Sequence, residues 1–211
     1  MRTEAERGYF YYEYLLILSP SSEIGKTITR FKKYVEEEYG CKLAAQLIPH
    51  MTLANFIQTS ENEEAIIRGF RNQASVVSPI HVGLKGFGKF NSHTVYVNVA
   101  TPKPIMDLVS NLKVKFADKL KLVDSLKPYF INKLHITIAR GMSPQQCEEV
   151  WAAYEKEAFN ATFYATEMLL LRRPVVLSNT GYFESAGRYQ KVAELPFEGK
   201  NSLGTQLPLF C

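Results

Sequence analysis

Hydrophobic and polar positions along the chain change several times between the two-residue period of a strand and the longer period of a helix. The aromatic and aliphatic run Tyr9–Ser19 predicts a buried strand, and the capping and acidic residues of Ser19–Glu23 predict the start of a helix that ends at Gly40. Further strands are predicted over 50–58, 79–84, 93–100, 133–140, 159–171 and 182–195, and further helices over 59–73 and 105–120 and from Ser143. Gly83–Gly88 is interpreted as a loop at the end of its strand, and residues 1–8 and 201–211 as loose ends.

The order helix, strand, helix, strand pair occurs twice in this series, with the strands over 50–58 and 133–140 at matching places. A repeat of this length is too long for a solenoid and fits two related lobes. The prediction is therefore an α+β fold in a single domain, 1–211, with two pseudo-symmetric lobes. The two matching strands are expected to face each other across a central cleft.

These two strands also carry the same short motif. Pro49–Phe56 and Leu134–Arg140 both read apolar residue or proline, histidine, apolar residue, threonine, apolar residue, alanine. One His-x-Thr tripeptide would be a weak signal, whereas two of them in similar apolar strands indicate a shared role.

Alternate side chains of a strand lie on one face, so each histidine is expected to share a face with its threonine. His50 and Thr52 would lie together in the first strand, and His135 and Thr137 in the second. Histidine is suited to general acid and general base catalysis because its ordinary pKa, ~6.5, is near neutral pH. The hydroxyls would donate hydrogen bonds to phosphoryl oxygens as negative charge accumulates on them.

The motif pair resembles that of the 2H phosphoesterase superfamily, in its 2'-5' RNA ligase-like (LigT-like) branch, and the resemblance runs from about residue 10 to about residue 197. It implies a duplicated fold in which antiparallel sheets face a central cleft and helices lie outside. The implied activity is metal-independent opening of 2',3'-cyclic phosphates on RNA ends or nucleotides by His50 and His135, possible in reverse as 2'-5' RNA ligation. It implies no cofactor and no metal site. Which histidine is the acid and which is the base is left open, as is the direction of the reaction.

Two further candidates follow from the resemblance. An arginine at the position of Arg140 contacts substrate in LigT-like proteins, although strict alternation places Arg140 opposite His135, so that a bulge or the strand end would have to turn it inward. Phe56, on the predicted His50 face, is a candidate for stacking on a base, whereas family members often carry their aromatic residue where this chain has Asn55. Arg172 or Arg173 is a candidate for the border of the cleft.

Composition and charge narrow the classes of protein and partner. The hydrophobic content of 46% and charged content of 22% are typical of a globular protein, and the formal net charge of +4 permits a phosphate-bearing partner but is low for a duplex-binding protein. The three cysteines are too scattered for a disulfide framework or a zinc site. No apolar run is long enough for a signal peptide or a membrane span, so a cytoplasmic protein without membrane contact is expected. The protein is also expected to be a monomer.

Other interpretations stay open at this stage. The same cleft would suit a non-catalytic protein that binds RNA ends, or a phosphoesterase for a nucleotide-derived metabolite. His81 is interpreted as structural, His93 as an exposed turn residue, and Lys32 and Lys33 as part of a solvated helix face. The lysines of the 105–120 helix and the segment after it are interpreted either as solvated or as a weak basic border for RNA; they are Lys113, Lys115, Lys119 and Lys121.

Overall fold

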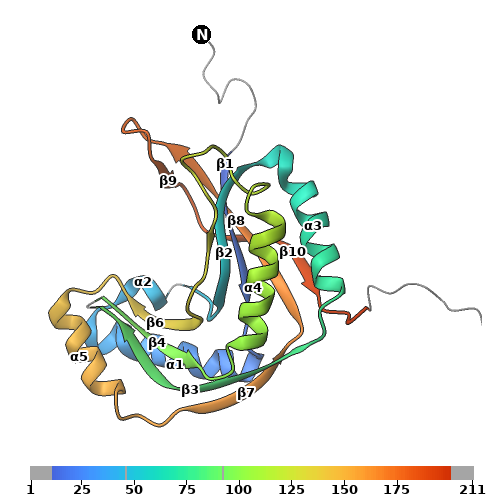
Figure 1. The fold of residues 1–211 in the computed structure, drawn as a ribbon. Helices are drawn as coiled ribbons and strands as arrows, with labels where there is room; N and C mark the ends of the chain where they lie inside the picture. Colours follow the sequence, from blue (N-terminus) through green and yellow to red (C-terminus); the bar gives the residue numbers. More distant parts are fainter. Residues whose placement is uncertain (1–10, 46, 92, 201–211) are drawn as a thin grey trace, which may run out of the picture.

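The structure, a computed structural model, describes residues 11–45, 47–91 and 93–200, and its larger sheet stands upright in Figure 1. Five strands of this sheet follow the order β10-β8-β1-β2-β5, and β9 pairs with β8 outside that path. Every pairing in the sheet is antiparallel. The strands are β1 (Tyr11–Leu18), β2 (Met51–Thr59), β5 (Tyr129–Phe130), β8 (Glu167–Leu177), β9 (Phe183–Ser185) and β10 (Gln190–Pro196).

The smaller sheet runs across the lower end of the larger one (Figure 1). Its order is β6-β4-β3-β7, again with antiparallel pairings. The strands are β3 (Ile80–Phe90), β4 (Thr94–Val99), β6 (His135–Arg140) and β7 (Asn160–Ala165). The two motif strands, β2 and β6, therefore belong to different sheets.

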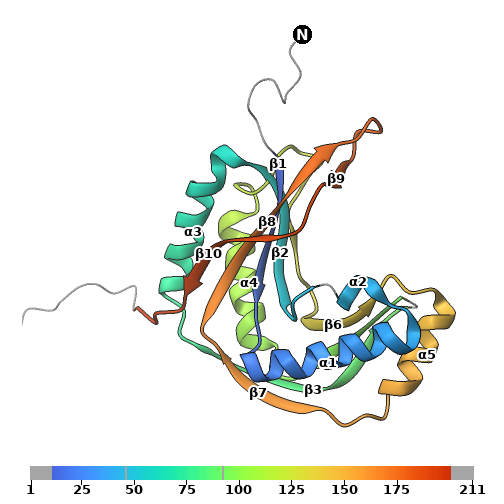
Figure 2. The same ribbon diagram turned by 180° about the vertical axis from the view of Figure 1, so that it is seen from behind.

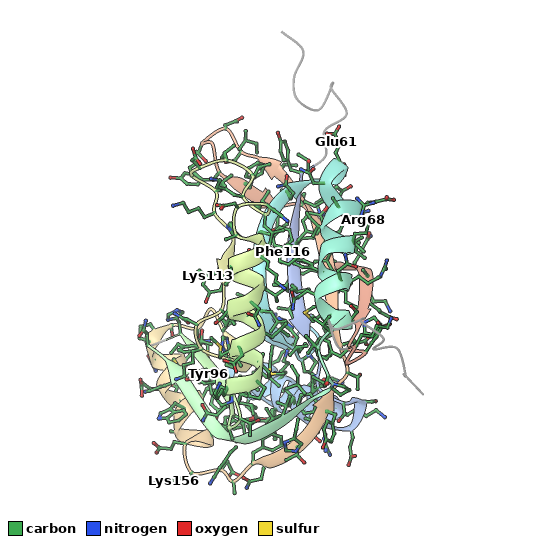
Figure 3. All side chains as sticks on the ribbon, turned by 45° about the vertical axis from the view of Figure 1, so that its right-hand side comes forward. Glu61, Arg68, Tyr96, Lys113, Phe116 and Lys156 are labelled. Carbon is green, nitrogen blue, oxygen red and sulfur yellow. The ribbon has the colours of Figure 1, made fainter. Side chains whose placement is uncertain are left out.

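Helices pack on both sheets. They are α1 (Ser22–Tyr39), α2 (Lys42–Ala45), α3 (Glu63–Ser75), α4 (Lys103–Phe116) and α5 (Pro144–Tyr154), with a 3-10 turn at Ser60–Asn62. Helices α3 and α4 lie beside the larger sheet, whereas α1, α2 and α5 gather around the smaller one (Figures 1 and 2). Phe116 lies between α4 and α3 (Figure 3), with its ring centroid 4.9 Å from that of Phe70. Helix α1 thus follows a strand of the larger sheet in sequence but packs on β6 of the smaller sheet.

The local sequence explains where the helices begin and end. Gly40 stops α1 by adopting φ = 69°, a left-handed conformation that glycine reaches without a steric penalty. Ser143 and Gln146 form a capping box at the start of α5, in which each side chain bonds the other residue's backbone N–H. Both boundaries agree with the prediction from the sequence.

One hydrophobic cluster joins the two sheets and their helices. In the larger sheet, Tyr14 stacks on Phe56 at 5.2 Å, and Phe56 in turn meets Phe70 of α3 at 6.3 Å. In the smaller sheet, Val97 and Ile136 are fully buried in the same cluster. The motif strands are therefore held by a common core.

The predicted α+β fold with antiparallel sheets is confirmed. The predicted order helix, motif strand, helix, strand pair holds in the first half, where β3 pairs with β4, but the strand predicted over 159–171 is two strands, β7 in the smaller sheet and β8 in the larger one. The interpretation of Gly83–Gly88 as a loop is wrong, because β3 continues through it to Phe90. A register shift between Leu84 and Phe87, with Gly86 at φ = 62°, lets the strand bend without ending. The sequence also missed β5, and the predicted loose ends over 1–8 and 201–211 lie outside the described residues. The single domain over 1–211 stays a prediction.

Candidate active site

Both motif strands carry one extra residue directly after the threonine. In β2, Thr52 pairs with Ile17 and Ala54 with Leu16, which leaves Leu53 without a partner in the register. In β6, Thr137 and Ala139 pair with successive residues of β4, which leaves Ile138 without one. Each strand therefore has a β-bulge at the same place in its motif, and the alternation of side chains shifts there by one residue.

The two bulges decide which side chains join the histidines. Asn55 and Arg140, each five residues after its motif histidine, turn to the same side as the histidine and threonine and line one pocket with them. Phe56 turns to the core instead, where it is only 3% exposed. The predicted placement of Phe56 beside His50 is thus wrong, whereas the bulge required for Arg140 to face the site is present.

The pocket lies where the two motif strands meet, with a volume of about 310 Å³. His50 and Thr52 line it from the larger sheet, and His135 and Thr137 from the smaller one. The rest of its lining is Leu15, Lys32, Leu47, Asn55, Tyr129, Ile131 and Arg140. The structure therefore brings the four motif residues predicted from the sequence together at one site.

The two imidazoles are held in the same way. Nδ1 of His50 lies 2.7 Å from the Ile48 carbonyl oxygen, and Nδ1 of His135 lies 2.8 Å from that of Lys133. A carbonyl oxygen only accepts a hydrogen bond, so each Nδ1 carries the hydrogen and each Nε2 keeps a free lone pair when the ring is neutral. Neither Nε2 bonds another described residue. Both rings can therefore take a proton at Nε2.

Their surroundings keep both histidines neutral at neutral pH. Burial lowers the pKa of His50 to about 4, and the nearby charges of Lys32 and Arg140 act in the same direction. Burial also lowers the pKa of His135, helped by Lys133. The rings of Phe90 and Tyr96 pack against His135 with centroids 4.8 and 5.2 Å away.

Lys32 is a site residue that was not predicted from the sequence. Its side chain is 2% exposed, lines the pocket and donates from Nζ to the Leu47 carbonyl oxygen at 2.9 Å, so its interpretation as solvated was wrong. The signal was present in the helical spacing, since the buried residues of α1 are Ile28, Lys32 and Val35.

Tyr129 and Asn55 form one wall of the pocket. They are opposite each other in the β2–β5 pairing, and Tyr129 is 50% exposed. Asn55 donates from Nδ2 to Glu13 Oε1 at 2.8 Å. Burial acts to raise the pKa of Glu13, but the hydrogen bonds from Arg173 and Asn55 outweigh it and hold that pKa below the ordinary value. Because an ionised carboxylate only accepts, the amide nitrogen of Asn55 must face Glu13.

Other residues considered from the sequence do not line the pocket, although Arg173 reaches its edge through Glu13, the partner of Asn55. Arg172 pairs with Glu63 and Arg173 with Glu13, each at 2.5 Å. His81 is exposed on β3, with its ring 5.3 Å from that of Tyr164. The lysines of α4 and the segment after it do not line the pocket either, and Lys113 is labelled on the outer surface in Figure 3.

Among the described residues, no three or more His, Cys, Asp or Glu side chains group as ligands for a metal ion. Cys41 and Cys147 are free thiols in the buried core. No helix over those same ranges is long and apolar enough to cross a membrane.

Comparison with known proteins adds a family and a fold. Residues 20–176 match the sequence model of the 2'-5' RNA ligase superfamily. The fold is similar to the crystal structure of TT0787 of Thermus thermophilus, with a TM-score of 0.61 and 15% identity over 90% of this chain and 100% of that one. It is also similar to E. coli LigT in complex with ATP, with a TM-score of 0.61 and 18% identity over 89% of this chain and 98% of that one. The complex of E. coli LigT with 3'-AMP is similar with a TM-score of 0.58 and 16% identity, again over 89% of this chain and 98% of that one. No curated protein sequence matches the chain.

Proposed function

Since the chain belongs to the 2'-5' RNA ligase superfamily of 2H phosphoesterases, we propose that it is a metal-independent phosphodiesterase that opens 2',3'-cyclic phosphates on RNA ends or nucleotides. The family resemblance recognised in the sequence is confirmed. One observation carries the proposal: two neutral imidazoles, each with Nε2 free, line a single pocket together with two threonine hydroxyls. Acid and base are then both supplied by the chain itself.

The proposed reaction is an in-line displacement at phosphorus. A water molecule loses a proton to Nε2 of one histidine while its oxygen attacks the phosphorus atom. The bond from phosphorus to one ribose oxygen breaks on the opposite side, and that oxygen takes a proton from Nε2 of the other histidine. The products are a phosphomonoester and a free ribose hydroxyl, and solvent returns the two rings to their starting protonation. With the 5'-hydroxyl of a second RNA end in place of water, the same attack on phosphorus would break the bond to the 3' oxygen, which takes the proton, and leave a 2'-5' linkage.

The acid requires a proton that the empty pocket disfavours. Burial and the charges of Lys32 and Arg140 lower the pKa of His50, and burial lowers that of His135. An anionic substrate placed between these cations would offset their charge and raise both values again. Substrate binding would therefore bring in the proton that the acid needs.

The remaining lining suits the other parts of the substrate. Thr52 and Thr137 have hydroxyls without a partner among the described residues, so both are free to donate to the non-bridging oxygens. Arg140 would contact the phosphoryl group. The crystal structures of E. coli LigT with 3'-AMP, ATP and NADP+ favour a ligand of nucleotide size, which also fits the volume of this pocket. The proposal keeps the cytoplasmic location and monomeric state expected from the sequence.

The test is hydrolysis of 2',3'-cyclic AMP in the presence of EDTA, followed by chromatography of the product. Replacing His50 or His135 by alanine should lower kcat by on the order of 10²- to 10⁴-fold, the usual contribution of one acid or base. The matched control is His81→Ala, an exposed histidine outside the pocket, which should act like the original protein. Full activity in either motif variant would remove the proposal.

Two other outcomes would lead to different assignments. Tight binding of RNA with no turnover of any cyclic phosphate would favour a protein that binds RNA ends. Turnover restricted to a small nucleotide-derived phosphodiester would favour a metabolite phosphoesterase.

A further inference from the structure

Lys32 is a buried lysine in the middle of α1. Its ammonium group donates to the Leu47 carbonyl oxygen, and no ion pair within the described residues involves it. An ammonium group has three N–H donors, so this single bond leaves it incompletely satisfied. The missing acceptor oxygens would have to come from something bound in the pocket that Lys32 lines.

A buried cation without a carboxylate destabilises the folded chain. Desolvation penalises the charged form, and it lowers the pKa of Lys32 to about 8, with a further contribution from Arg140. Ile28 and Val35, the other buried residues of α1, are apolar, and an apolar side chain at position 32 would continue that face. Packing alone therefore does not explain a lysine here.

The pocket also has an unbalanced charge. Lys32 and Arg140 are the cations in its lining, and no carboxylate lines it with them. Since both histidines are neutral when it is empty, the lining carries two positive charges. A cyclic phosphodiester carries one negative charge, whereas the five-coordinate transition state and a phosphomonoester product carry up to two. The charge of the lining matches the dianion better than the substrate.

We propose that Lys32 is a catalytic residue whose Nζ contacts a non-bridging phosphoryl oxygen, and that with Arg140 it makes the pocket complementary to a dianionic phosphoryl group. The inference rests on the proposed function for its catalytic part. A group complementary to charge that develops during the reaction lowers the barrier, because it binds the transition state more tightly than the substrate. The proposal also predicts that this pocket binds a phosphomonoester or inorganic phosphate more tightly than a diester of similar size.

The experiment compares two neighbouring lysines. Lys32→Met keeps the length and apolar stem of the side chain but removes its charge, and Lys33→Met does the same at an exposed position outside the pocket. Three properties are measured for each: kcat on 2',3'-cyclic AMP, the affinity for inorganic phosphate by calorimetry, and the thermal unfolding midpoint. Lys32→Met should lower kcat by on the order of 10²- to 10³-fold, as removal of one transition-state donor does elsewhere. It should also weaken phosphate binding by at least about tenfold, as expected when one charge-assisted hydrogen bond is lost. The unfolding midpoint should rise, and Lys33→Met should change none of the three.

If Lys32 had a structural role, Lys32→Met would lower the unfolding midpoint instead of raising it. A lower midpoint, or failure of Lys32→Met to fold, would overturn the proposal, because both would mean that the lysine stabilises the fold. Unchanged kcat and phosphate affinity in a folded Lys32→Met variant would overturn it as well. Phosphate binding is measured without turnover, so a protein inactive on all cyclic phosphates could still show Lys32-dependent phosphate binding. That result would remove the proposed function and leave the dianion site in place.

Discussion

Asn55 and Arg140 occupy equivalent positions in the two motif strands, each five residues after its histidine and each turned into the pocket by a bulge at the residue that follows the threonine. The strands match in burial from the residue after the histidine to the alanine. They differ in chemistry at the next position, where one supplies a neutral amide and the other a cation. The pocket is therefore positively charged where Arg140 of β6 lines it and uncharged where Asn55 of β2 lines it.

Arg140 should matter more for the phosphoryl group than for the fold. Replacing Arg140 by glutamine should lower kcat/KM for 2',3'-cyclic AMP by on the order of 10- to 100-fold, as expected for a lost hydrogen bond between charged groups. The unfolding midpoint should stay within the small range of a surface substitution, because Arg140 is exposed. Arg68→Gln on the outer side of α3 (Figure 3) is the control, and it should leave both properties unchanged. Equal losses in the two variants would point to a general effect of charge.

Tyr129 should bind the nucleobase. Its exposed ring, opposite Asn55, offers an aromatic surface of the kind on which a base stacks. Tyr129→Ala should raise KM for 2',3'-cyclic AMP by about tenfold, and should leave KM for a ribose cyclic phosphate without a base unchanged. Tyr129→Phe, which keeps the ring, should act like the original protein, as should Tyr164→Ala on the far edge of the smaller sheet. A matching rise in KM for the base-free substrate would exclude stacking as the cause.

Phe56 should contribute to stability instead of substrate binding. It is buried between Tyr14 and Phe70, so Phe56→Ala should reduce the free energy of unfolding by about 3 to 5 kcal/mol through the cavity it leaves. Urea unfolding monitored by circular dichroism measures this change. The KM of the folded fraction should not move, and a selective rise in KM for substrates with a base would return Phe56 to the site.

His50 should make the protein less stable in acid. Its pKa is 6.5 in the unfolded chain and about 4 in the folded one, so the unfolded state binds more protons between these values. The stability held above pH 6.5 is therefore lost as the pH falls towards 4, by on the order of 1 to 2 kcal/mol for this partly exposed ring. His50→Gln should show a smaller fall in the unfolding midpoint between pH 7 and pH 4 than the original protein. Identical pH profiles would mean that the ring stays accessible to protons in the folded state.

The motif pair could be read from the sequence because its chemistry repeats at matching places in two predicted strands. The two bulges could not be predicted from the sequence, because the extra residue in each strand is apolar and is followed by an alanine. Leu53-Ala54 and Ile138-Ala139 look like continuous core positions, so simple alternation was carried past them. The error placed Phe56 in the site and left Asn55 out of it.

Lys32 and Tyr129 were missed for different physical reasons. Lys32 falls on the buried face of α1, but a charged residue is more often solvated, and that general tendency outweighed its spacing from Ile28. Tyr129 lies on a two-residue strand, too short to show any period. Its position opposite Asn55 depends on pairing between segments far apart in the sequence, which hydrophobic patterning does not reveal.

Helix α1 follows β1 of the larger sheet but rests on β6 and α5, and the first half of the sequence also supplies β3 and β4 to the smaller sheet. In turn, the second half of the sequence supplies β8 and β10 to the larger sheet, where β8 pairs with β1. Each half of the polypeptide therefore covers apolar surface that belongs to the other. A fragment carrying one motif alone would expose that surface to water, and it could bury it again only by exchanging the same elements with a second molecule.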